Sequence, residues 1–78
     1  MICCLCGEDI KGYGNNAEPL KVGRCCDKCN DNVITFRLYV TVDNLKRAHP
    51  DYSDRKINEL YEEMRLGFRH KCLLGERL

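Results

Sequence analysis

The chain has 78 residues, of which 44% are hydrophobic, and its thirteen basic and twelve acidic residues leave a net charge of +1. This near-neutral charge excludes the strongly basic field of a general nucleic-acid binder, and no stretch approaches the roughly 18 apolar residues that a membrane span requires. The length predicts one domain that needs a metal ion or disulfide bonds, because so short a chain buries little apolar surface.

Cysteine is the residue type that departs most from ordinary composition. There are seven cysteines, and six of them lie in the first 30 residues. They could form a secreted disulfide framework or a metal site. The N-terminal run Met1-Ile2-Cys3-Cys4 has no feature of a signal peptide, and an odd number of cysteines would leave one thiol outside any set of disulfides. We therefore expect a metal-binding protein in a reducing cytoplasm.

The first element along the chain is a turn formed by Cys3-x-x-Cys6, and the same spacing returns at Cys26-x-x-Cys29 after 19 intervening residues. A two-residue gap lets a tight turn direct both sulfurs toward one ion, and Gly7 supplies the permissive backbone that such a turn needs. Two such pairs are typical of a tetrahedral thiolate site. We predict one Zn²⁺ per chain, bound by Cys3, Cys6, Cys26 and Cys29.

A short hairpin is predicted between the two cysteine pairs. Residues 12–16, Gly-Tyr-Gly-Asn-Asn, form a dense turn signal. Residues 8–11 and 19–25 lie on either side of this signal and could pair as two short strands. The sequence thus predicts a hairpin with residues 12–16 as its turn.

A helix is predicted next, beginning near Cys26 or Asp27 and continuing through Tyr39. Asp27 suits the positive end of the helix dipole, and the exposed N–H groups there would stabilise thiolate charge on the second cysteine pair. Residues 33–42 are rich in β-branched and aromatic side chains, which by propensity alone favour a strand. Helix and strand both remain open for this segment.

The last predicted element is an amphipathic helix that follows Pro50 and is capped by Asp51 or Ser53. Charged residues occupy one of its faces, and Gly67 either ends the helix or weakens its last turn. On the other face, apolar residues recur at three- and four-residue steps, namely Ile57, Leu60, Tyr61, Met64 and Phe68.

Two other cysteine pairings exist beside the predicted ones. Cys4-x-Cys6 and Cys25-x-x-x-Cys29 could also supply ligands, although neither spacing suits the usual turn as well. The simpler interpretation is that Cys4 and Cys25 are small apolar side chains beside the site. A second metal ion shared among all six cysteines is the alternative.

The remaining cysteine and the two histidines lack a clear ligand motif. Cys72 is most simply a free, partly buried thiol, and His70 beside it would need a partner pair that the sequence does not contain. His49 precedes Pro50 and is expected in a loop. Four thiolates could also bind iron, but a rubredoxin-like site would have Gly after its second pair, where this chain has Asn30.

The order of these elements, a turn at residues 3–7, a hairpin and a helix opened by Cys26-x-x-Cys29, resembles a treble-clef zinc finger. Residues 3–34 are also similar to short Cys-rich zinc-finger proteins of phage and prophage genomes. This resemblance implies a metal-binding role for the four cysteines and a phage origin, and it carries no settled activity. The predicted fold is a small α+β domain, residues 1–78, with a zinc-binding module at 1–42 and a C-terminal helical extension at 43–78.

These features favour a non-enzymatic protein that binds or inhibits a protein partner, with a bacterial host protein as the expected target of a phage product. The basic end of the last helix is the predicted contact surface, through Arg65, Arg69 and Lys71. The alternative is a nucleic-acid-binding regulator, in which these residues and His70 would contact phosphates. We expect no enzymatic activity, because no Ser/His/Asp arrangement or phosphate-binding loop stands out, and a thioredoxin-like role needs a single Cys-x-x-Cys motif.

Overall fold

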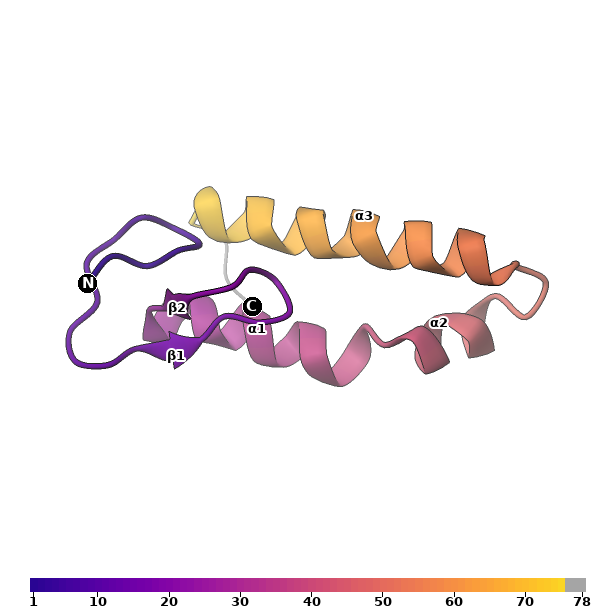
Figure 1. Cartoon of the computed structure of the whole chain (residues 1–78), viewed down its shortest axis with the longest axis horizontal. Helices are drawn as coiled ribbons and strands as arrows, with labels where there is room; N and C mark the ends of the chain where they lie inside the picture. The colour runs from indigo at the N-terminus through magenta and orange to yellow at the C-terminus, as the bar shows by residue number, and fades with distance from the viewer. Residues whose placement is uncertain (76–78) are drawn as a thin grey trace.

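A computed structural model describes residues 1–75 of the chain, so the last three residues of the predicted 43–78 extension lie outside it. The described part is a small α+β structure with one two-stranded antiparallel hairpin and three helices. Its elements are β1 (Asn15–Asn16), β2 (Arg24–Cys25), α1 (Asp27–Tyr39), α2 (Val42–Ala48) and α3 (Asp54–Leu73). The molecule is elongated, with extents of 44 × 20 × 19 Å. In Figure 1, α3 runs alongside α1 and α2, while the hairpin lies beside α1 at one end.

The hairpin differs in part from the predicted one. Its second strand, β2, lies inside the predicted segment 19–25, but β1 falls within residues 12–16, which we expected to form the turn. The prediction of a strand at residues 8–11 that pairs with 19–25 is therefore wrong. That segment instead meets the start of the chain, where Asp9 forms an isolated bridge with Ile2.

Contacts of the Arg24 side chain explain why β1 lies later than predicted. Its guanidinium donates hydrogen bonds to the Tyr13 carbonyl at 3.0 Å and the Gly14 carbonyl at 2.9 Å, which holds this stretch against β2. The chain reverses further on, where the Ala17 N–H donates to the Gly23 carbonyl at 3.0 Å. The turn is thus placed by a side chain about ten residues away, and the local turn signal at 12–16 does not decide it.

Helix α1 begins directly after Cys26, its N-cap, as predicted. It continues through Tyr39, so the strand interpretation of residues 33–42 is wrong. Val33 and Phe36 are fully buried, and they are spaced to lie on one face of a helix. Burial of this face against α3 therefore outweighs the local preference of the β-branched residues for a strand.

Helix α2 is an element that the sequence analysis did not predict. Thr41 caps it, because its hydroxyl accepts a hydrogen bond from the Asn44 N–H at 3.1 Å. Leu45 in its middle is buried in the core. In the sequence, the β-branched residues Val40 and Val42 favour a strand, so no helix was predicted here. In the fold, the Thr41 cap and the burial of Leu45 stabilise the helix.

Helix α3 starts after Ser53, whose hydroxyl accepts a hydrogen bond from the Lys56 N–H at 3.3 Å, and this decides between the two predicted caps. The helix continues past Gly67 to Leu73, so Gly67 does not end it. Its outer face is charged, and no helix within residues 1–75 is both long enough and apolar enough to cross a membrane. The predicted apolar stripe faces the core, with Ile57 buried and the others packed against it: Leu60, Tyr61, Met64 and Phe68.

The aromatic ring of Phe36 lies at the centre of the contact between α1 and α3. It is fully buried and makes edge contacts with Tyr61 and Phe68, at centroid distances of 5.3 and 5.2 Å. One cluster of buried side chains runs from Cys3 to Cys72 through this ring. The cysteine-rich end and the helices therefore share a core.

Candidate metal centre

Four cysteine sulfurs converge at the end of the molecule where the chain begins. The Sγ atoms of Cys3, Cys6, Cys26 and Cys29 all lie within 4.8 Å of one another, and those of Cys6 and Cys26 are 3.7 Å apart. A zinc ion with four sulfur ligands at about 2.3 Å requires sulfurs separated by about 3.8 Å. The four predicted residues are thus brought together at a spacing that fits one tetrahedral metal ion.

The first pair of sulfurs is positioned by a tight turn. The N–H groups of Leu5 and Cys6 both donate to the Cys3 Sγ at 3.4 Å, and the Gly7 N–H donates to the Cys3 carbonyl at 3.0 Å. Gly7 has a φ of +80°, a conformation in which an L side chain is strained. This turn, residues 3–7, is hereafter called the knuckle.

The second pair of sulfurs lies at the beginning of α1. Cys26 is the N-cap and Cys29 lies in the first turn, where the Asn30 N–H donates to the Cys26 carbonyl at 3.0 Å. A helix start presents unpaired N–H groups and the positive end of the dipole, which both stabilise thiolate charge. The Asn15 amide donates to the Asp27 carboxylate at 2.9 Å and so attaches β1 to this helix start.

The surroundings of Cys3, Cys6 and Cys29 shift the pKa values of their thiols in different directions. Burial raises the pKa of Cys3, but N–H groups of Cys6, Cys26 and Leu5 outweigh it and lower that pKa to about 6. Burial raises the pKa of Cys6, and it raises the pKa of Cys29 strongly, with hydrogen bonds from neighbouring sulfurs adding to the effect. Thiols packed this closely cannot all ionise unless a cation neutralises them, which is what a divalent metal ion does.

The other cysteines of the N-terminal end lie beside the cluster. Within residues 1–75, the group that could hold a metal ion contains only the four cysteines named above. Cys25 is fully buried, and burial raises its pKa to about 11. Cys4 is half-buried, and its N–H donates to the Arg24 carbonyl at 2.9 Å. Both act as packing residues next to the site, which matches the simpler of the two interpretations above.

Cys72 is the residue near the site that sequence reasoning missed. We expected a free and partly buried thiol, but Cys72 is fully buried and its Sγ accepts a hydrogen bond from the Asn32 amide at 3.3 Å. The pKa values of Cys25 and Cys29 are raised mainly by burial, and Coulombic interaction with Cys72 adds to the rise in both. Cys72 therefore packs the end of α3 against the cluster of four cysteines. The signal was present, because Cys72 continues the apolar stripe four residues after Phe68.

Within residues 1–75, neither histidine belongs to the group of residues that could hold a metal ion. His49 lies between α2 and α3, where its ring stacks on Tyr52 at a centroid distance of 4.4 Å. His70 lies near the end of α3 and is exposed. The half-site of His70 and Cys72 that we considered does not form, because Cys72 is buried beside Asn32.

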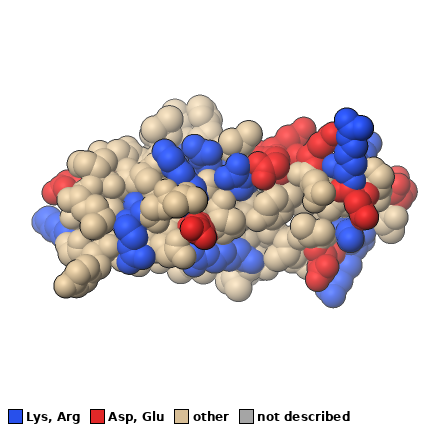
Figure 2. Space-filling view, in the orientation of Figure 1, with Lys and Arg blue, Asp and Glu red and all other residues tan. Residues whose placement is uncertain are grey.

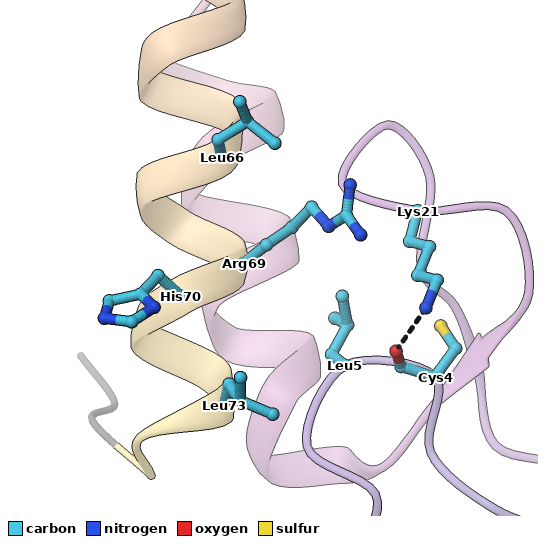
Figure 3. Close-up of a pocket in the computed structure, with 7 residues that line it drawn as sticks. All are labelled: Cys4, Leu5, Lys21, Leu66, Arg69, His70 and Leu73. Atoms are coloured by element: carbon cyan, nitrogen blue, oxygen red, sulfur yellow. Dashed lines mark hydrogen bonds between the residues drawn. The ribbon is translucent and has the colours of Figure 1, made fainter.

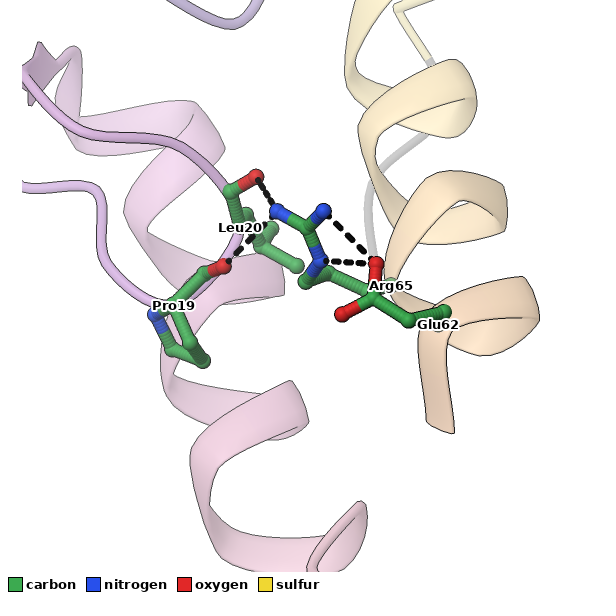
Figure 4. A network of polar contacts seen from close by, with 4 residues as sticks. All are labelled: Pro19, Leu20, Glu62 and Arg65. Carbon is green, nitrogen blue, oxygen red and sulfur yellow. Dashed lines mark hydrogen bonds and ion pairs between the residues drawn. The ribbon is translucent and has the colours of Figure 1, made fainter. Parts of the chain in front are cut away.

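The three predicted partner-binding residues, Arg65, Arg69 and Lys71, have different surroundings. Figure 4 shows the Arg65 guanidinium directed at the loop after β1, where it donates to the Pro19 and Leu20 carbonyls at 3.3 and 3.1 Å. It also pairs with Glu62 at 2.8 Å. Arg65 thus binds α3 to the hairpin loop. The ammonium of Lys71 lies 5.4 Å from the centre of the Phe68 ring.

Arg69 contributes to a cavity between the knuckle and the last turns of α3. The cavity has a volume of about 300 Å³, and we call it the knuckle groove. Six of its lining residues are Cys4, Leu5, Lys21, Leu66, Arg69 and Leu73. Figure 3 shows Lys21 and Arg69 on opposite sides of the groove, with the Lys21 ammonium donating to the Cys4 carbonyl at 3.3 Å.

Comparisons with protein-family models, curated proteins and solved structures find no match to this chain. The resemblance to zinc fingers thus rests on the cysteine spacing and on the local geometry of the knuckle and the α1 start. The function has to be argued from these features and from the surfaces around them.

Proposed function

We propose that this chain is a non-enzymatic zinc-binding interaction protein, in which the metal braces the N-terminal half. The supporting observation is the closed set of four thiols, within 4.8 Å of one another and buried apart from the half-buried Cys6. Structural zinc sites have four protein ligands, whereas catalytic ones keep a position for water or substrate. A site filled by four cysteines therefore suits a structural role.

The local geometry supports a treble-clef type of zinc finger. A knuckle carries the first two cysteines, a two-stranded hairpin follows, and a helix begins with the second two. Zinc suits this set because its filled d shell imposes no coordination geometry, so it readily accepts four thiolates in a tetrahedron. We propose one Zn²⁺ per chain, and we expect the purified protein to be colourless, since an iron site of the same ligands would absorb visible light.

The partner is proposed to bind near the C-terminal end of α3. The inner side of this helix is occupied by the core, and Arg65 is engaged with the hairpin loop, so Arg69 and Lys71 are the basic residues left for recognition. The resemblance to phage zinc-finger proteins makes a bacterial host protein the first class of partner to test. Inhibition of such a protein would follow if the contact covered a functional surface.

An affinity capture from bacterial lysate, read by mass spectrometry, tests this function. The bait is the zinc-loaded protein, and the matched baits are Arg69→Glu/Lys71→Glu and the control Arg47→Glu/Arg55→Glu, whose charges lie at the other end of the molecule. We expect a protein that the wild type and the control retain and the first variant loses. Circular dichroism and zinc content must show that all three are folded.

Two results would contradict the proposal. Equal capture by all three baits would mean that the α3 end is not the contact surface. Binding to oligonucleotides that weakens steeply as salt is raised, and is lost in Arg69→Glu/Lys71→Glu, would support the nucleic-acid-binding regulator instead.

A further inference from the structure

The knuckle groove presents two cations to the same space. The Lys21 ammonium donates to the Cys4 carbonyl on one side of the groove, and Arg69 extends from α3 on the opposite side (Figure 3). Within residues 1–75 neither cation has an ion-pair partner, and no acidic residue lines the groove.

The convergence of these cations is built into the fold. Arg69 lies one turn after Arg65, and Arg65 fixes α3 to the loop that carries Lys21 through the Pro19 and Leu20 carbonyls. Two like charges that face one cavity repel each other, and an anion bound between them would offset this electrostatic repulsion. The groove is therefore arranged to favour an anionic occupant.

The groove also has an apolar side. Leu66 and Leu73 of α3 border it, and they are 52% and 64% exposed, while Leu5 of the knuckle is buried beneath. These leucines lie on the same helix end as Arg69. His70 is also at the groove, but its ring points away from Leu5 in Figure 3. An occupant that matches the whole surface has both negative charge and apolar groups.

We propose that the knuckle groove binds a short acidic peptide segment of the partner protein. One carboxylate lies between Lys21 and Arg69, and a neighbouring apolar side chain covers Leu66 and Leu73. This inference rests on the proposed function, since it specifies the chemistry of the partner at the same end of α3. The volume of about 300 Å³ suits one or two side chains, which makes the site an anchor point for a longer contact.

Charge around the groove favours a peptide over a nucleic acid. A polynucleotide needs a run of cations along its phosphates. Further toward the start of α3, however, the surface carries Glu59, Glu62 and Glu63. Figure 2 shows most of the visible acidic side chains over the half of the molecule that holds α2 and the start of α3, with basic side chains among them. A long polyanion would meet these carboxylates, whereas a short acidic peptide ends before them.

Selection from a displayed library of random twelve-residue peptides tests the proposal, with the zinc-loaded full chain as bait. We expect the recovered sequences to combine Asp or Glu with a large apolar residue. A synthetic copy of the most enriched peptide should bind about tenfold more weakly to Lys21→Gln or to Arg69→Gln, because each loses a charged hydrogen bond. Leu66→Ser should also weaken binding, and the control Arg47→Gln should not.

The outcomes separate this inference from the proposed function. Peptides without acidic residues, peptides whose affinity is unchanged by Arg69→Gln, or no enrichment at all would overturn the acidic-peptide site. Displacement of the peptide by a short oligonucleotide at physiological salt would also overturn it in favour of nucleic acid. If the captured lysate protein binds Lys21→Gln/Arg69→Gln as tightly as the wild type, the groove proposal fails and the interaction function stands. If the wild-type bait retains no lysate protein, the interaction function itself fails.

Discussion

The two ends of this molecule are held together by different interactions. The first 26 residues contain two strands of two residues each and a series of turns, with cysteine sulfurs as their common centre. Residues 27–75 form three helices that pack through Phe36, Tyr61 and Phe68. The comparison suggests that metal binding stabilises the first region and apolar packing the second.

The two regions meet along a shared boundary. Leu20 of the hairpin loop is fully buried in the same hydrophobic core as Phe36. Cys72 of α3 belongs to this core too and packs beside the four cysteines of the candidate site. Arg65 adds polar contacts across this boundary. The difference between the regions can therefore be tested by removing the metal, the core ring and the boundary residues in turn.

Loss of the metal is expected to have the largest effect. Cys29→Ser, or a strong chelator, should unfold the N-terminal region, because structural zinc contributes about 10–16 kcal/mol in finger peptides and a small domain has about 5–15 kcal/mol in all. Zinc content and circular dichroism of the variant measure this. Cys4→Ser is the matched control and should keep one zinc ion. A variant Cys29→Ser that keeps its zinc would show that another cysteine is the fourth ligand.

Truncation of the central ring comes next. Phe36→Ala should lower the free energy of unfolding by about 3–5 kcal/mol, since it removes a fully buried ring and leaves a cavity. The N-terminal region should still bind zinc in the absence of denaturant, because its ligands are unchanged. Urea unfolding followed by circular dichroism, with zinc content measured on the native protein, tests both parts. Loss of zinc without denaturant would mean that the metal site depends on the helical core.

Removal of the buried thiol on α3 should cost less. Cys72→Ala should lower the free energy of unfolding by about 2 kcal/mol, because it leaves a small cavity and deletes the sulfur that accepts the Asn32 amide. The zinc content should stay at one ion per chain. A fall in zinc content in an otherwise folded Cys72→Ala protein would assign Cys72 to the metal instead of to packing.

The smallest expected changes in the free energy of unfolding come from substituting Arg65 or Arg69, which lie one helical turn apart. Arg65→Gln should lower the free energy of unfolding by about 1 kcal/mol, because three-quarters of its side chain is covered and it bonds two carbonyls of the hairpin loop. Arg69→Gln should change that free energy by less than about 0.5 kcal/mol, as surface substitutions usually do. Parallel urea titrations of the two variants check this. Equal losses would mean that Arg69 also holds α3 in place.

Local signals in the sequence were sufficient for the parts of the site that are themselves local. Each Cys-x-x-Cys pair sits on one turn, so its spacing and the neighbouring Gly7 already indicate where two sulfurs point. The start of α1 after Cys26 and the stripe on α3 follow from capping and from helical periodicity in the same way. These features depend on residues within a few positions of one another, which is why they could be predicted.

Tertiary structure alone decided the features that depend on distant parts of the chain. The place of β1 is determined by Arg24, and the role of Arg65 by carbonyls 45 and 46 residues away. Cys72 lies buried beside the four cysteines of the candidate site, and Lys21 faces Arg69, only because α3 packs back along the molecule. Backbone carbonyls have no signature in a sequence and helix docking depends on the whole core, so no local pattern could have predicted these contacts.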